Sequence, residues 1–248
     1  MDLSIIIPIC STADAAMPPL EKALNSIKYL NNGDNYTVIV AGNKDNIDKF
    51  REIYNAVKCP QVLKTVIVED TDYAEIINNA VMACLTPYFS VIEVDDLFAN
   101  YWFECVDEYI NNNNDYSCFL PINELLKDGE ESVGFANEIV WGASFNDDDK
   151  LGEVLLSSLK LHKDFCVAGS VIKTEDFISV GKLDKEMGPL AWTEYLVRSV
   201  KNGKQTFVIP TVGYYHNILR SNTLTESDRK AITSDKIQEI IDKIENLF

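Results

Sequence analysis

The chain has 248 residues, of which 46% are hydrophobic, and a formal net charge of −17. This length and hydrophobic content predict one sizeable core in a globular protein. The negative charge, with no basic stripe to meet phosphates, argues against a nucleic-acid-binding protein.

Neither a membrane anchor nor a disulfide framework is expected. No apolar run approaches the roughly 18 residues of a membrane-spanning helix, and no basic leader precedes the first apolar segment. The six cysteines form no Cys-x-x-Cys pair and no zinc-like cluster with the two histidines. Most of them lie in apolar surroundings, which is typical of buried free thiols. We therefore expect a cytoplasmic protein with reduced cysteines.

Short β-branched segments alternate with helix-like stretches in the first part of the chain. Such alternation predicts βαβ units, and hence a single α/β domain with a mostly parallel central sheet flanked by helices. The expected strands are 3–9, 37–42, 65–70, 88–94, 118–122 and 206–216. The expected helices are 18–30, 46–57, 72–85 and 99–111.

Two segments lie outside this alternation. Residues 123–150 are rich in Glu, Asp and Asn and lack a clear period, which predicts a long loop or a mobile lid. Residues 226–248 carry isoleucines at helical spacing. They predict an amphipathic helix that packs on the main domain, residues 1–225, or on a partner.

Three carboxylates follow the fourth expected strand. The sequence YFSVIEVDDLF, residues 88–98, runs from an apolar segment into Glu93, Asp95 and Asp96. Like charges this close repel, and burying them is costly unless a cation or hydrogen bonds compensate. Because open α/β folds bind ligands at the carboxyl ends of their strands, the acids fit a metal site. A solvated turn after the strand is the alternative.

Four blocks of sequence follow one another along the chain. They are LSIIIPIC…LEKALNSI, YAEIINNAVMACLTPYFSVIEVDD, FISVGKLDKEMGPLAWTEYLVRSVKNGKQTFVIP and YYHNILRS. In this order they resemble the family 2 glycosyltransferases, which are inverting enzymes of the GT-A (Rossmann-like) fold. The blocks correspond to the family's first strand and helix, its central Asn-bearing helix and acidic D-x-D motif, its acceptor-side stretch and its late His-containing loop. The resemblance covers roughly residues 3–221. It implies a metal-dependent transfer of sugar from a nucleotide-sugar donor to an unknown acceptor, which can be a glycan, a protein or a small molecule.

The resemblance implies a divalent cation, Mn²⁺ or Mg²⁺, at the acids. Such an ion, held by one or two carboxylates, neutralises the departing diphosphate as a Lewis acid. Glu93 and Asp95 fall at the ends of the D-x-D-like motif and are the expected carboxylate ligands, and Asp96 is expected to orient metal-bound water. His216, in the late loop, is a candidate further ligand, although a lone His is as readily structural.

Other residues are implied to contact the donor. Pro8 and Ile9 end the first strand, and Asn78 falls at the family's helix Asn. Arg220 suits bidentate contact with phosphate oxygens. Trp192 suits stacking against a sugar, or packing in the core.

The sequence does not indicate which nucleotide base the protein would recognise. The family's second strand usually ends in acids, one of which recognises the base, whereas this chain has Ala41 and Gly42. Asn43 and Asp45 are the polar residues just beyond them and are the remaining candidates.

An inverting reaction needs a base to take the proton of the acceptor hydroxyl. The family has an acidic pair near the start of the helix that carries its Arg, and here that region reads AWTEY, residues 191–195. Glu194 is the nearby acid and the candidate base. An i,i+4 ion pair with Arg198 is the equal alternative.

Two further hypotheses remain open. The chain can be a GT-A-shaped binding or assembly protein whose catalytic site has decayed, because fold alone does not fix function. A nucleotidyltransferase is disfavoured, since the segment PICSTADAAMPP after the first strand has no Gly, Lys or Arg.

Overall fold

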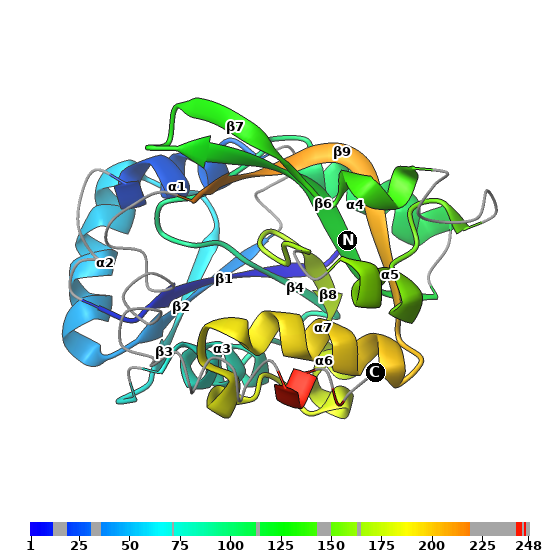
Figure 1. Cartoon of the computed structure of the whole chain (residues 1–248). Coiled ribbons are helices and arrows are strands. Elements are labelled where there is room, and N and C mark those ends of the chain that lie inside the picture. Colours follow the sequence, from blue (N-terminus) through cyan, green and yellow to red (C-terminus); the bar gives the residue numbers. More distant parts are fainter. Residues whose placement is uncertain are drawn as a thin grey trace.

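The computed structural model describes residues 1–11, 19–30, 36–70, 72–112, 115–142, 150–162, 165–218, 242–244 and 246. In these parts a mixed β-sheet is covered by helices on both faces (Figure 1). The α/β fold that the sequence predicts is confirmed.

The N-terminal half supplies a parallel sheet in the order β3-β2-β1-β4. Its strands are β1 (Leu3–Ile9), β2 (Thr37–Gly42), β3 (Val62–Ile67) and β4 (Tyr88–Val91). Its helices are α1 (Pro19–Lys28), α2 (Lys44–Val57) and α3 (Tyr73–Met82). The chain builds outward from β1 to β3 and then returns to the other side of β1 with β4. This reversal creates a switch point at the carboxyl ends of β1 and β4, where such sheets bind ligands.

The C-terminal half extends the sheet in the order β4-β8-β6-β9-β5, with β7 paired to β6. Its strands are β5 (Leu97–Phe98), β6 (Tyr116–Lys127), β7 (Glu131–Ala136), β8 (Val171–Lys173) and β9 (Gln205–Asn217). Its helices are α4 (Trp102–Asn112), η2 (Glu138–Trp141), α5 (Leu156–Leu161), α6 (Thr174–Val180), η4 (Lys185–Leu190) and α7 (Ala191–Lys201). Here β8 runs antiparallel to β4 and β6, whereas β9 runs parallel to β6.

The core lies on both faces of the sheet. In β1, Leu3, Ile5 and Ile7 pack in the cluster that includes α1, α2 and α4, and Ile6 packs in the opposite cluster with α3 and α7. Successive side chains of a strand point to opposite faces, so a strand covered on both sides reads as the continuous apolar run LSIIIPI. All residues of β1 are buried.

Residues 123–150 are predicted to form a long loop or a mobile lid, and this prediction is wrong for most of the described residues in that range. Residues up to Lys127 extend β6, and the chain then turns into β7. Asp128 and Gly129 both have positive φ, 52° and 74°, as the central residues of a tight hairpin turn do. An Asp-Gly pair between extended segments is a hairpin signal. Residues 143–149 of the predicted loop lie outside the described residues.

The predicted C-terminal helix lies almost wholly outside the described residues. Residues 242–244 are helical, and Ile244 is buried in the cluster with α3 and α7. Among the described helices, none has the length and hydropathy to cross a membrane. All six cysteines are free thiols, as expected.

Candidate active site

The three acids lie at the switch point. β4 ends at Val91, the amide of Ile92 still donates to the carbonyl of Ile6 in β1 (3.0 Å), and the chain then turns through residues 93–96. Pro8 and Ile9 close β1 in register with Ala41 and Gly42 of β2. The sheet therefore brings the ends of three parallel strands to the edge that carries the acids.

Glu93 is fixed by two tyrosines. The Tyr73 hydroxyl donates to Glu93 Oε1 (2.6 Å), and the Glu93 amide donates to the Tyr214 hydroxyl (3.1 Å). Burial raises the pKa of the Glu93 carboxyl to about 8, with the charges of Asp96 and Asp95 acting in the same direction. The hydrogen bond from Tyr73 opposes this rise.

Asp96 lies beneath the surface of the site. It is 1% exposed and accepts hydrogen bonds from the Asn217 amide and from His216 Nδ1, both at 2.8 Å. Both of its carboxylate oxygens therefore bond to neighbouring residues of β9. The expected role of Asp96 in orienting metal-bound water stays a prediction, and in the structure its carboxylate orients the imidazole of His216.

Asp96 holds the imidazole of His216 through Nδ1. The other ring nitrogen, Nε2, does not contact Asp96. Burial lowers the pKa of His216, but the hydrogen-bonded Asp96 carboxylate outweighs burial, and the net shift is upward. Glu93 and Asp95 add to the upward shift. The expected proximity of the imidazole to the acids is therefore present.

Asp95 is partly exposed and lies close enough to raise the pKa of both Glu93 and His216. Within the described ranges, no group of three or more His, Cys, Asp or Glu side chains is placed to hold a metal ion by itself. Mg²⁺-type sites on nucleotides need only one or two carboxylates, since phosphates and water supply the other ligands. The carboxylate oxygens of Glu93 and Asp95 are hard donors that repel each other, and they are therefore suited to such a cation.

Trp192 turns its indole toward this site. Its Nε1 donates to the Tyr73 hydroxyl (3.1 Å), while its ring lies 6.1 Å from that of Phe177 and 5.9 Å from that of Tyr195. Tyr73 and Tyr214, which contact Glu93, are not among the site residues expected from the sequence. The available signal was their position, since Tyr73 begins the helix that follows β3 and Tyr214 lies two residues before His216.

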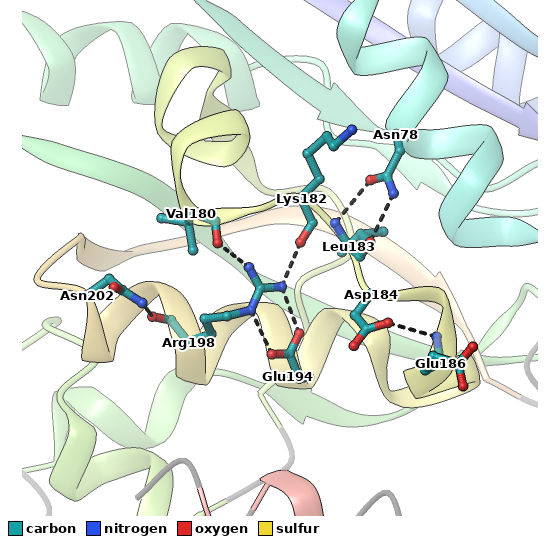
Figure 2. Close-up of polar contacts among 9 residues, drawn as sticks. All are labelled: Asn78, Val180, Lys182, Leu183, Asp184, Glu186, Glu194, Arg198 and Asn202. Carbon is teal, nitrogen blue, oxygen red and sulfur yellow. Dashed lines mark hydrogen bonds and ion pairs between the residues drawn. The ribbon is translucent and has the colours of Figure 1, made fainter.

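Glu194 forms an ion pair with Arg198. Arg198 Nε and Nη2 donate to the two carboxylate oxygens of Glu194, at 2.7 and 2.8 Å. The same guanidinium donates to the carbonyls of Val180 (2.5 Å) and Lys182 (2.6 Å), as Figure 2 shows. Glu194 is buried at 6% exposure. The structure thus shows the ion-pair alternative for Glu194, although as a buried pair rather than a surface one.

Asn78 holds the same connecting segment from the opposite side. Its Nδ2 donates to the Leu183 carbonyl (2.9 Å), and its Oδ1 accepts from the Leu183 amide (3.0 Å) (Figure 2). Arg198 and Asn78 together fix residues 180–183, which we call the clamped loop and which run from the last residue of α6 toward η4. These contacts are structural, and direct contact of Asn78 with a donor stays a prediction.

The remaining candidates lie at the end of β2 or outside the described chain. Asn43 caps α2, since its side chain accepts from the Asn46 amide (2.9 Å), and Asp45 is exposed in the first turn. A β-carbon on Gly42 would come within 2.4 Å of the Ile9 carbonyl oxygen, so a larger residue does not fit there. Arg220 lies outside the described residues.

No protein-family model matches the chain, and no curated protein sequence matches it. Solved structures do match. The structure of S. aureus TarS 1-349 in complex with UDP-GlcNAc superposes with a TM-score of 0.75 at 13% identity, over 100% of this chain and 66% of that one. The mannosyltransferase PcManGT from Pyrobaculum calidifontis, in complex with GDP-Man and Mn²⁺, matches with a TM-score of 0.64 at 13% identity, over 89% of this chain and 58% of that one.

The chain spans less than two thirds of the length of these structures, and 39% of the longer S. aureus TarS chain. An identity of 13% shows a shared fold and leaves the chemistry to be argued from the site. The chain thus has the GT-A-like fold of these glycosyltransferases.

Proposed function

We propose that the chain is a metal-dependent, inverting glycosyltransferase that uses a nucleotide-sugar donor. The observation that carries this proposal is the group of Glu93, Asp95 and His216 at the switch point of a GT-A-like sheet. The charges of Asp96 and Asp95 raise the pKa of Glu93, and a bound cation would remove this repulsion. The complexes of the matched structures with UDP-GlcNAc and with GDP-Man and Mn²⁺ support the same ligand class.

Asp95 and Glu93 would hold Mn²⁺ or Mg²⁺, with His216 beside them. Bound there, the cation would supply Lewis-acid stabilisation of the departing diphosphate. The protein's own part is to hold these groups in place. Tyr73 and Tyr214 hold Glu93, and the buried Asp96 holds His216 through Nδ1.

The donor would lie along the ends of β1 and β2. Pro8 and Ile9 border that edge, and Asn43 and Asp45 stand at the start of α2 beyond it. Backbone amides at a helix start favour a negatively charged or hydrogen-bonding group. Asn78, Trp192 and Arg220 remain candidate contacts for the sugar and its phosphates.

A second candidate function has a specific observation in its favour. Inverting transfer requires a base that can reach the acceptor hydroxyl. The carboxylate of Glu194 is buried and bound on both oxygens by Arg198, so it can act as that base only if the pair separates. A GT-A-shaped protein that binds nucleotide sugars without transferring them is consistent with this geometry.

Release of nucleoside diphosphate from a donor panel separates the two candidates. UDP-GlcNAc and GDP-Man, each with Mn²⁺, would be incubated with the protein, and UDP or GDP would be quantified with and without candidate glycan acceptors. A transferase gives release that EDTA abolishes and that Asp95→Asn lowers. Donor binding without any release would favour the binding protein, and absence of binding to every donor would contradict both candidates.

A further inference from the structure

Tyr73 connects two parts of the site that lie far apart in the sequence. Its hydroxyl lies between Trp192 Nε1 (3.1 Å), at the start of α7, and Glu93 Oε1 (2.6 Å), in the turn after β4. Tyr73 itself is the first residue of α3, whose N-cap Asp72 accepts from the Glu75 amide (3.0 Å). The hydroxyl is therefore placed by a capped helix end rather than by a free loop.

The direction of these hydrogen bonds is set by chemistry. An indole N–H can only donate, so the Tyr73 oxygen must accept from Trp192. The hydroxyl hydrogen of Tyr73 then points to Glu93, whose Oε1 accepts it. Tyr73 bonds Oε1, and among the described residues no hydrogen bond reaches the other carboxylate oxygen, Oε2.

Trp192 and Glu93 are each held a second time. The Trp192 ring packs against Phe177 and Tyr195, with ring centroids 6.1 and 5.9 Å apart. The backbone amide of Glu93 donates to the Tyr214 hydroxyl (3.1 Å). Fixed at both ends, the Trp192–Tyr73–Glu93 chain leaves the carboxylate few orientations.

We propose that Tyr73 is a positioning residue whose hydroxyl, directed by Trp192, fixes the Glu93 carboxylate in the orientation that binds a divalent cation. The inference rests on the proposed function in one respect, the cation that accompanies the nucleotide. It assigns to Trp192 a hydrogen-bonding role at the metal side of the site. Outer contacts of this kind change metal affinity by about 10–100-fold when they are removed.

Tyr73→Phe tests the proposal, because it removes the hydroxyl and keeps the ring. Mn²⁺ would be titrated into the protein with saturating UDP or GDP, and free Mn²⁺ would be followed by its electron paramagnetic resonance signal, which needs no turnover. We expect the dissociation constant for Mn²⁺ to rise about tenfold or more. Trp192→Phe, which removes the directing N–H, should weaken Mn²⁺ binding in the same direction.

Tyr195→Phe is the matched control. Tyr195 is a buried tyrosine of the same aromatic group, and its hydroxyl bonds Ser199 rather than Glu93. Its loss should leave Mn²⁺ affinity within about twofold of wild type, because the Glu93 carboxylate keeps its donor. A general loss of packing would instead weaken Mn²⁺ binding equally in both tyrosine variants, and that result would overturn the positioning role.

A crystal structure of metal-free Tyr73→Phe gives a second readout that is independent of the proposed function. The Glu93 carboxylate should turn away from the position that it holds in the wild type. If it stays in place, or if wild type and Tyr73→Phe bind Mn²⁺ equally well, the positioning role is overturned while the proposed function stands. If the wild type binds no Mn²⁺ with either nucleotide, the proposed function fails together with the cation part of the inference.

Discussion

The negative charge of Glu93 destabilises the folded chain in the absence of a cation. Its pKa in the folded chain is about 8, against 4.5 for an ordinary glutamate. Between these pH values the folded state keeps a proton that the unfolded state has lost. Stability therefore falls as pH rises from about 4.5 to about 8. His216 acts in the same direction, because its raised pKa gives stability that is lost as pH rises through that pKa.

Glu93→Gln should flatten this pH dependence. Glutamine can still accept from Tyr73 but does not titrate, so the fall in melting temperature between pH 5 and pH 8 should be smaller than in the wild type. Scanning calorimetry of the metal-free protein at several pH values measures it. The residual slope belongs to His216 and other groups. An unchanged slope in Glu93→Gln would show that Glu93 is not the titrating group.

Glu194 contributes to stability through its ion pair. In Glu194→Gln, Arg198 loses a charged partner in a largely buried setting, and we expect a loss of about 1–3 kcal/mol in the free energy of unfolding by urea. Glu75→Gln is the control, because Glu75 pairs with Lys185 at the surface (3.6 Å) and should lose less than about 1 kcal/mol. If Glu194→Gln instead keeps wild-type stability and loses donor turnover about a hundredfold, Glu194 is the base after all.

The sequence allows the acids and His216 to be located, but not their partners. Glu93, Asp95 and His216 stand out because they follow apolar strands. The burial of Asp96 and the contact of Tyr73 with Trp192, 119 residues away in the sequence, arise from packing of distant elements. Local patterns carry no information about such contacts, so the sequence alone does not predict that Asp96 is buried.

At the scale of elements, the clamped loop is the feature that connects α3 to α7. Asn78 of α3 binds the amide and the carbonyl of Leu183, and Arg198 of α7 binds the carbonyls of Val180 and Lys182. The loop thereby fixes the start of η4 and, beyond it, of α7, which carries Trp192. The arrangement of Trp192 near Tyr73 thus depends on contacts outside the site.

Asn78→Ala should release the clamped loop locally. It removes both hydrogen bonds to Leu183, and the opening free energy that protects the Leu183 amide from hydrogen exchange should fall by about 1–3 kcal/mol. Asn79→Ala is the control, since the exposed Asn79 side chain bonds within α3, to the Glu75 carbonyl (2.7 Å), and to no other described residue. Exchange of the Leu183 amide measured by NMR would contradict the clamp if Asn78→Ala and Asn79→Ala gave the same protection.

Element boundaries show where local signals suffice. The expected strands at 3–9 and 37–42 agree with β1 and β2, because both are apolar runs buried in the centre of the sheet. The expected strand at 65–70 lies instead at Val62–Ile67, an edge strand with partly exposed side chains. No side chain of β3 is fully buried, so hydrophobicity does not mark where the strand begins and ends. Its hydrogen-bonded pairing with β2 sets these boundaries instead. β6 is longer than the expected strand at 118–122, because its polar C-terminal end pairs with β7.

At the scale of the molecule, alternation of strands and helices was enough to predict the fold class. It did not predict β8, three residues long, which runs antiparallel between β4 and β6 and joins the two halves of the sheet. So short a strand is set by its neighbours rather than by its own pattern. The order of strands nevertheless places the carboxyl ends of β1 and β4 side by side. Residues from separate sequence motifs therefore lie at the same edge of the sheet.

The most direct test of the account is calorimetric titration of UDP and GDP into wild type and Asp95→Asn, each with Mn²⁺ and with EDTA. Asp48→Asn, at an exposed position on α2, is the control for loss of one negative charge. We predict nucleotide binding that depends on Mn²⁺ in the wild type and in Asp48→Asn, and that is at least about tenfold weaker in Asp95→Asn, while all three proteins unfold at similar temperatures. Equal binding of the nucleotide by Asp95→Asn and the wild type, or binding that EDTA does not change, would contradict a metal-dependent nucleotide-sugar site at the end of β4.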